Sequence, residues 1–154
     1  MMEKNPFAKG YRDLIVYQKA REVAKLVFAV TSSFPKDEMY SLIDQARRSS
    51  RSVGAQIAEA WAKRRYPKHF TSKLSDADGE QNETQHWLDT SVDCGYLKAP
   101  HAAELNGKLQ EIGRMLQCMM DRAGEFQGPN DSCVHETAQP YGSSTLDKFF
   151  SPLV

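Results

Sequence analysis

Four stretches of this sequence carry apolar residues at intervals of three or four positions, and this spacing restricts the fold more than any other feature. It places apolar side chains on one face of a helix with 3.6 residues per turn. The first stripe, within residues 13–32, contains Val16, Ala20, Val23, Val27 and Val30, and it is widened by Tyr17, Ala24 and Phe28. Comparable stripes fall within residues 37–65, 67–95 and 100–126. No sustained alternation of apolar and polar residues indicates strands, so the sequence predicts an all-α fold.

The ends of these stripes carry residues that start or stop helices. Asp13 is suited to the N-cap of the first helix, because its carboxylate can accept backbone N–H groups of the first turn. Pro35 ends that helix, Pro67 suits the first position of the third, and Gly95 suits the C-terminal cap of the third. Short connections between four amphipathic helices favour an antiparallel up-down-up-down four-helix bundle.

The length of 154 residues fits a single core. We predict an N-terminal arm at 1–12, a four-helix bundle domain at 13–126 and a C-terminal tail at 127–154. The tail is rich in Gly, Pro, Ser, Asn and Thr, which predicts little regular structure. Its segment Leu146–Phe150 contains apolar side chains. That segment is either a frayed terminus or a short docking peptide.

Two regions inside the predicted helices depart from an ordinary apolar stripe. The second helix has small residues at its centre, among them Ser49, Ser50 and Gly54, which predict a close crossing with a neighbouring helix. The third helix is polar over residues 78–86. This polar turn either meets solvent or forms a network with another helix or subunit, in which case its groups need partners.

The sequence favours a cytoplasmic protein without a membrane segment. No apolar run approaches the roughly 18–20 residues of a spanning helix, and the first ten residues do not resemble a secretory signal. Three cysteines, Cys94, Cys118 and Cys133, are an odd number without metal-type spacing. We expect reduced thiols, with Cys94 and Cys118 filling the core.

The net charge of zero conceals an uneven distribution. Residues 1–66 hold 13 Lys and Arg against 7 Asp and Glu, residues 67–126 hold 6 against 10, and residues 127–154 hold 1 against 3. A basic first half beside an acidic second half indicates either an anionic partner or helices and subunits that complement each other.

Basic residues form two groups on or just after the second helix. Guanidinium groups suit phosphate because they can donate hydrogen bonds in pairs. The alternative is structural, since cations favour a helix C-terminus and arginines pair with acids across interfaces. The candidate residues for binding nucleic acid or another partner are Arg47, Arg48, Arg51, Lys63, Arg64, Arg65 and Lys68.

No arrangement typical of an enzyme is evident. The sequence lacks a P-loop, a Gly-x-Gly-x-x-Gly turn and a Gly-x-Ser-x-Gly elbow. Glu83 and His86 form one Glu-x-x-His step, whereas di-iron bundles need a second such step and two further glutamates. His101 and Glu104 have the reverse order. We expect no catalytic residues, no cofactor and no metal.

Several ordered stretches are similar to a known family. In order and spacing they resemble the bacterial four-helix bundle proteins related to the 23S rRNA intervening sequence protein, a fold also used by the accessory variability protein of diversity-generating retroelements. The resemblance covers about residues 11–126, and no single motif is diagnostic. The stretches are 13–20 (DLIVYQKA), 45–53 (QARRSSRSV), 56–61 (QIAEAW), 73–77 (KLSDA), 83–88 (ETQHWL) and 94–97 (CGYL).

The resemblance implies a homopentameric barrel without known enzymatic activity. For the retroelement branch it implies binding to a reverse transcriptase and to nucleic acid through a basic surface. The long tail and the neutral net charge depart from the family. Glu59 and Glu83, which lie in the shared stretches, are candidates to pair with Arg47, Arg48 or Arg51.

We therefore expect a non-enzymatic homo-oligomeric scaffold or adaptor, most simply a pentamer whose principal partner is itself. The alternative is a ring that binds RNA or DNA through the basic surface of the second helix, with a nucleic-acid-processing protein as partner.

Overall fold

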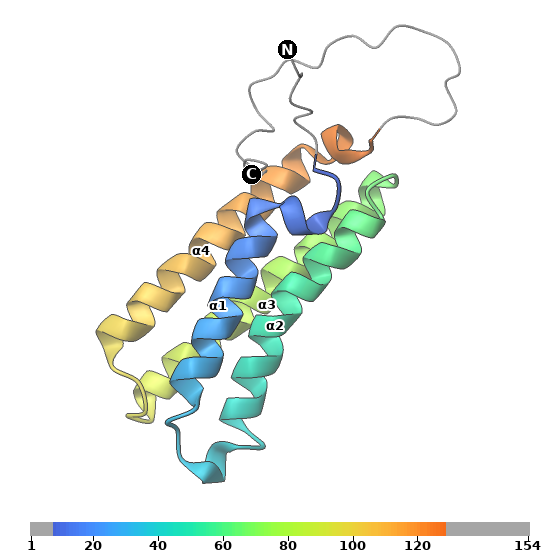
Figure 1. Ribbon diagram of the computed structural model, residues 1–154. Coiled ribbons are helices and arrows are strands. Elements are labelled where there is room, and N and C mark those ends of the chain that lie inside the picture. Colours follow the sequence, from blue (N-terminus) through green and yellow to red (C-terminus); the bar gives the residue numbers. More distant parts are fainter. Residues whose placement is uncertain (1–7, 129–154) are drawn as a thin grey trace, which may run out of the picture.

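The computed structural model describes residues 8–128 and shows four long antiparallel helices (Figure 1). The helices are α1 (Ile15–Thr31), α2 (Leu42–Ala62), α3 (Pro67–Asp93) and α4 (Ala99–Asp121), with short 3-10 turns η1 (Tyr11–Asp13), η2 (Lys36–Glu38) and η3 (Ala123–Phe126). Residues 8–128 contain no strand. The all-α four-helix bundle is confirmed. The predictions for most of the tail, including Leu146–Phe150 and Cys133, lie outside the described residues.

The core is built from the apolar stripes that the sequence predicts. Val16 and Val27 of α1, Ile57 of α2, Leu74 of α3 and Ile112 of α4 have no exposed surface. Burial of one such side chain contributes roughly 1.5–3 kcal/mol to folding. Phe28 was included at the edge of the first stripe, yet it is 47% exposed. Its ring lies on the side of α1 that faces Arg47 of α2 rather than the core.

Asp13 does not cap α1, which is a correction to the sequence analysis. The N-cap of α1 is Leu14, whose side chain is buried. The Asp13 carboxylate instead accepts the backbone N–H groups of Lys9 at 2.9 Å and Gly10 at 3.3 Å. It therefore stabilises η1, the turn that precedes the helix.

Helix α2 begins later than the expected residue 37. Ser41 has a non-helical backbone (φ −127°, ψ −99°), which separates η2 from α2. The carboxylate of Glu38 accepts the Ser41 hydroxyl at 2.6 Å and the N–H of Leu42 at 3.3 Å. Glu38 thus satisfies a free N–H at the start of α2. The helix ends at Ala62, three residues before the expected end.

Pro67 and Gly95, which the sequence predicts at the two ends of the third helix, lie at the start and just after the end of α3. Pro67 is its first residue. At its end, Gly95 adopts a positive φ of 76°. The N–H of Gly95 donates to the carbonyl of Val92, and the N–H of Tyr96 donates to that of Ser91. This pair of bonds is the Schellman arrangement, in which glycine accepts the left-handed conformation without steric cost.

Two polar side chains at the centre of α3 face the interior of the bundle, whereas the rest of the polar stretch is partly or fully exposed. Thr84 is fully buried, and its hydroxyl lies 2.9 Å from that of Ser49 on α2. Gln81, 4% exposed, donates to Asp78 at 2.9 Å and accepts from Gln85 at 2.7 Å. Of the two interpretations left open by the sequence, the packed network is therefore the one observed for these side chains.

The two cysteines within residues 8–128 differ in their exposure to solvent. Cys94 is exposed, so its prediction as a core residue is wrong: it is the residue that caps the end of α3. Cys118 is partly buried and packs against the core. Within this part of the chain, no helix combines the length and the apolar character needed to cross a bilayer.

Candidate binding surface on helices α1 and α2

Arg47, the first of the candidate basic residues, is largely engaged inside the chain. Its Nε donates to Thr31 Oγ1 at 2.9 Å, and its guanidinium lies 4.4 Å from the centre of the Phe28 ring. Thr31 is the last residue of α1, so the Arg47 charge lies at the negative end of that helix's dipole. The structural alternative raised by the sequence applies to this arginine.

Arg48 forms an ion pair with α3. Its Nη2 lies 2.8 Å from Glu83 Oε1, which also accepts the indole N–H of Trp87 at 3.2 Å. A second glutamate, Glu80, lies 3.9 Å from Arg48 Nη1. The Arg48 side chain is about half exposed, and such exposed pairs contribute about 0–1 kcal/mol. The pair orients Arg48 towards α3 and partly neutralises its charge.

Glu59 pairs with a lysine of α3 rather than with an arginine of α2. Glu59 Oε2 lies 3.1 Å from Lys73 Nζ. The hydrogen bond with Glu59 is the main cause that raises the pKa of Lys73 above its ordinary value. The lysine was not singled out from the sequence, because nothing in the spacing of α2 indicates which α3 residue lies opposite Glu59.

Arg51 differs from its two neighbours because it has no carboxylate partner among residues 8–128. It is exposed and lies 5.8 Å from the centre of the Phe28 ring. The exposed face of Phe28 is therefore flanked by Arg47 and Arg51. This alternation of cations with an aromatic ring is typical of surfaces that bind anionic or aromatic ligands.

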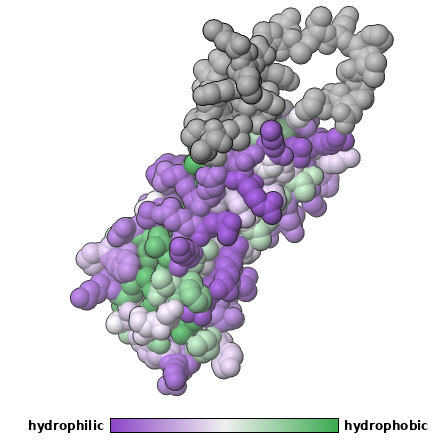
Figure 2. All heavy atoms as spheres, in the orientation of Figure 1, coloured by the Kyte–Doolittle hydropathy of each residue, from purple (hydrophilic) through white to green (hydrophobic). Residues whose placement is uncertain are grey.

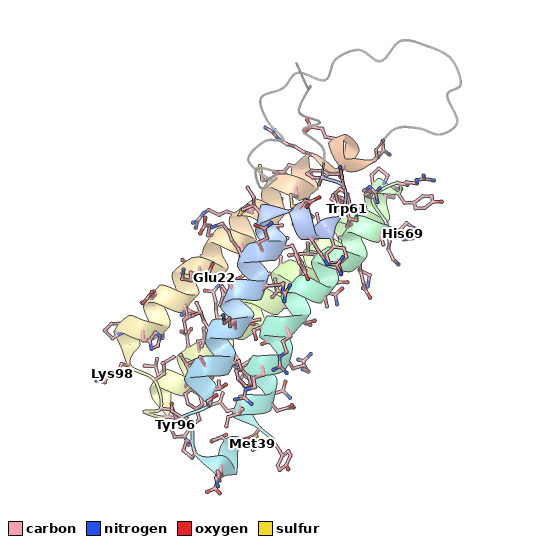
Figure 3. The ribbon with its side chains drawn as sticks, viewed as in Figure 1. Glu22, Met39, Trp61, His69, Tyr96 and Lys98 are labelled. Carbon is pink, nitrogen blue, oxygen red and sulfur yellow. The ribbon has the colours of Figure 1, made fainter. Side chains whose placement is uncertain are left out.

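The second basic group lies at the other end of α2. Lys63 is sixteen residues beyond Arg47, about 24 Å along a helix axis. Arg64 stacks 4.4 Å from the Trp61 ring and donates to the Trp61 carbonyl at 3.0 Å. Lys63, Arg65 and Lys68 are exposed. Trp61 and His69 mark this end in Figure 3, opposite the end that carries Met39 and Tyr96. The seven candidates thus form two separate patches.

Between the two patches lies an open groove of about 410 Å³, which the sequence did not indicate. Its floor is small and apolar, and two arginines and two tyrosines surround it. From the sequence, Tyr17 and Ala24 are recognised only as residues that widen the apolar stripe of residues 13–32. We call it the α1–α2 groove; its residues are Tyr11, Tyr17, Ala20, Arg21, Ala24, Ser50, Arg51, Gly54, Ala55 and Ala58.

Gly54 of α2 faces α1 beneath this groove. A Cβ atom at position 54 would lie 3.6 Å from Tyr17 Cε2 and 4.0 Å from the Ala20 Cβ. These are ordinary contact distances, so the Tyr17 ring packs directly on the α2 backbone. The close crossing predicted from the small residues of α2 is observed here, although an alanine at position 54 would also fit.

The far end of the bundle is closed by a polar contact between its two loops. The Tyr96 hydroxyl donates to Glu38 Oε1 at 3.2 Å, and the ring of Tyr96 lies 5.5 Å from that of Phe34. Loss of solvent, followed by the bond to Glu38, raises the pKa of Tyr96. The contact joins the α1–α2 connection to the α3–α4 connection.

The side chains of residues 8–128 contain no group of three His, Cys, Asp or Glu placed to hold a metal ion. His86 packs edge-on against Trp87 at 4.7 Å, and the neighbouring Glu83 is occupied by Arg48. What the described surface offers is binding chemistry: a groove, exposed arginines and aromatic rings.

Comparison with known proteins adds a family and a structural relative. Residues 12–118 match the family described as 23S rRNA-intervening sequence protein. A crystal structure of a protein of unknown function from the S23 ribosomal protein family of Bacteroides thetaiotaomicron matches with a TM-score of 0.61 and 26% identity. That match covers 69% of this chain and 98% of the other. No curated protein matches the chain.

Proposed function

Because this chain belongs to the 23S rRNA-intervening sequence protein family, we propose that it works as a non-enzymatic scaffold or adaptor, assembled from five copies of itself. The assembly presents one binding surface per protomer to a partner. Each protomer contributes rigid helices, and repetition around a ring multiplies weak contacts with an extended partner.

The observation that carries this proposal is the apolar surface of the C-terminal half of α1. Phe28 and Ala29 are exposed, and Leu26 and Val30 are only partly covered. Figure 2 shows apolar residues gathered on this half of the molecule, within a surface that is otherwise hydrophilic. Contiguous exposed apolar surface of this kind marks association sites in soluble proteins. Met39 and Tyr40, 42% and 94% exposed, add apolar area near the same end.

Light scattering on the purified chain tests the assembly. We expect a species of roughly 87 kDa, five times the 17.4 kDa of one chain, whereas a 17.4 kDa species at all concentrations contradicts the proposal. Ala29→Glu places a charge on the apolar surface without disturbing the core, and should dissociate the assembly. Ser75→Glu is the matched control, since Ser75 is exposed on α3, away from that surface.

Binding of RNA or DNA is the second candidate function, and Arg51, which lies beside Phe28 and has no carboxylate partner among residues 8–128, favours it. An arginine without a carboxylate partner can take a phosphate oxygen without breaking an existing ion pair. An adjacent ring can stack on a base, as on surfaces that bind single strands without sequence preference. A nucleic-acid-processing protein would be the corresponding protein partner.

A salt titration tests this second function. Binding that depends on phosphate weakens steeply as salt rises, because bound cations are released. Arg51→Gln should weaken binding to mixed-sequence RNA and DNA and reduce its salt dependence. Arg48→Gln is the control, since Arg48 is already paired with Glu83. Equal binding by the two variants, or binding insensitive to salt, rejects the function.

A further inference from the structure

The α1–α2 groove is a depression that remains open among the residues the structure describes, 8–128. We propose that it is the docking site for the segment Leu146–Phe150 of the same chain, which would fold the C-terminal tail back along α1 and α2. The groove adjoins the apolar half of α1 invoked for self-association, because Arg51 lines the groove and lies 5.8 Å from the centre of the Phe28 ring, but docking of the segment does not depend on the pentamer.

The shape and chemistry of the groove suit the apolar side chains of this segment. Its floor consists of Ala20, Ala24, Gly54 and Ala55, so the space above it is open to a bulky apolar side chain. A volume of about 410 Å³ falls within the range of sites that enclose small ligands. The segment Leu146–Phe150 supplies two phenylalanines and a leucine within five residues. Aromatic rings bury 150–250 Å² each and dominate the energetics of such contacts.

The charges of the groove and of the tail are complementary. Arg21 and Arg51 stand on opposite walls of the groove, and neither has a carboxylate partner among residues 8–128. The tail carries three acidic residues and one lysine. Asp147 lies inside the apolar segment itself, where it can reach one of the two arginines once the phenylalanines are seated.

The chain between the bundle and the segment Leu146–Phe150 is long enough to reach the groove. The described chain ends at Gly128, just after η3, where Phe126 stacks on Phe70 at 5.3 Å. η3 lies at the same end of the bundle as η1, which contributes Tyr11 to the groove (Figure 1). Leu146 lies eighteen positions after Gly128, and such a length spans about 60 Å when extended. The 21 residues of α2 measure roughly 32 Å, so the segment can reach the groove.

Chymotrypsin cleavage of the full chain tests the proposal, because the enzyme cuts after Phe149 and Phe150. Released tail peptides are followed by mass spectrometry. Proteolysis of this kind tracks the population of the undocked segment. We expect Ala55→Glu, which fills the groove and repels Asp147, to accelerate cleavage after Phe149 and Phe150 about tenfold. Ala62→Glu is the matched control on the exposed surface of α2 beyond the groove, and should leave the rate unchanged.

A charge exchange tests the assigned contact with Asp147. Arg51→Glu should accelerate cleavage, and the double variant Arg51→Glu with Asp147→Arg should restore slow cleavage. Protection must also persist on serial dilution, because docking within one chain is independent of concentration. Equal rates in wild type, Ala55→Glu and Ala62→Glu overturn the proposal. Protection that disappears on dilution also overturns it, since the groove then holds the tail of a second copy.

Discussion

Gly113 of α4 lies directly against the side-chain amide of Gln81 on α3: a Cβ atom on Gly113 would stand 2.8 Å from Gln81 Nε2 and 3.2 Å from Asp78 Oδ1. The absence of a side chain at position 113 is therefore what allows the buried Gln81 to keep its hydrogen bonds to Asp78 and Gln85. The relationship links one glycine of α4 to the polar network of α3.

The substitution Gly113→Ala should destabilise the bundle although alanine is the better helix former. Alanine gains up to about 1 kcal/mol of helix propensity. The new Cβ displaces the Gln81 amide, and a buried polar group left without a partner costs about 1–3 kcal/mol. We expect a net loss of about 1 kcal/mol in urea unfolding.

Gly107→Ala on the same helix is the matched control, because no neighbouring atom lies within 4 Å of the position of its Cβ. This variant should be more stable than wild type by up to about 1 kcal/mol. If both alanine variants are stabilised alike, the close approach of Gly113 to Gln81 has no energetic weight.

The buried hydroxyls of Ser49 and Thr84 should behave as a coupled pair. Their oxygens lie 2.9 Å apart in a region without solvent. Thr84→Val alone removes the hydroxyl that donates to Ser49, whose own hydroxyl keeps its bond to the Ala46 carbonyl, and should cost about 1 kcal/mol. In a double-mutant cycle with Ser49→Ala, the two losses should sum to more than the cost of the double variant, by at least about 0.5 kcal/mol. Strict additivity would mean that the two hydroxyls do not interact.

The contacts of Glu38 should make stability depend on pH in the acid range. The Ser41 hydroxyl bond is the largest cause that lowers the pKa of Glu38, followed by the Leu42 N–H, and the Tyr96 hydroxyl also lowers it. A folded-state pKa below the unfolded value of about 4.5 means that Glu38 stabilises the fold above that pH. This stabilisation is lost as the pH falls through the folded-state pKa.

Glu38→Gln should therefore be less stable than wild type at neutral pH, and the difference should shrink below about pH 4.5. Urea unfolding at a series of pH values measures it. Glu104→Gln, an exposed position of α4, should show no such change. A difference between Glu38→Gln and wild type that stays constant down to low pH contradicts the assigned contacts.

Arg47 and Arg51 should separate structural from binding roles. Arg47→Gln loses the bond to Thr31 and the stacking on Phe28, and should lower the free energy of unfolding by about 1 kcal/mol. Arg51→Gln should change it by less than about 0.5 kcal/mol, as for exposed side chains generally. Thermal unfolding compares them. Equal destabilisation by the two variants would show that Arg51 is also needed for the fold.

The helices could be predicted because their cause is local. Val16, Ala20, Val23 and Val27 repeat at the helical period, and all four are buried. Pro67 and Gly95 act through their own backbone chemistry, which a sequence displays directly. Asp13 was predicted to cap α1 but stabilises η1, the short turn before it. A carboxylate at this point of a sequence can serve either element, and only the backbone conformation of Leu14 decides between them.

The surface could be predicted only in part, because its chemistry depends on partners distant in sequence. Arg47, Arg48 and Arg51 look equivalent in the sequence. In the structure, Arg47 bonds to Thr31 at the end of α1, Arg48 pairs with Glu83 of α3, and Arg51 lies beside Phe28 without a carboxylate partner among residues 8–128. The polar residues around Gln81 show the same limitation, since their burial depends on Gly113, more than thirty positions later. The binding roles proposed for the three arginines are predictions.

The contact between Tyr96 and Glu38 has a practical consequence for experiments on living cells. It seals the pole of the bundle that holds the two loops, whereas η1 and η3 both lie at the opposite pole (Figure 1). A fluorescent reporter or affinity handle fused directly before η1, or directly after Gly128 in place of the tail, would therefore lie at the pole opposite the two loops. The loop pole, with Tyr40 projecting from it, would stay open for imaging or pull-down of whatever the protein meets there.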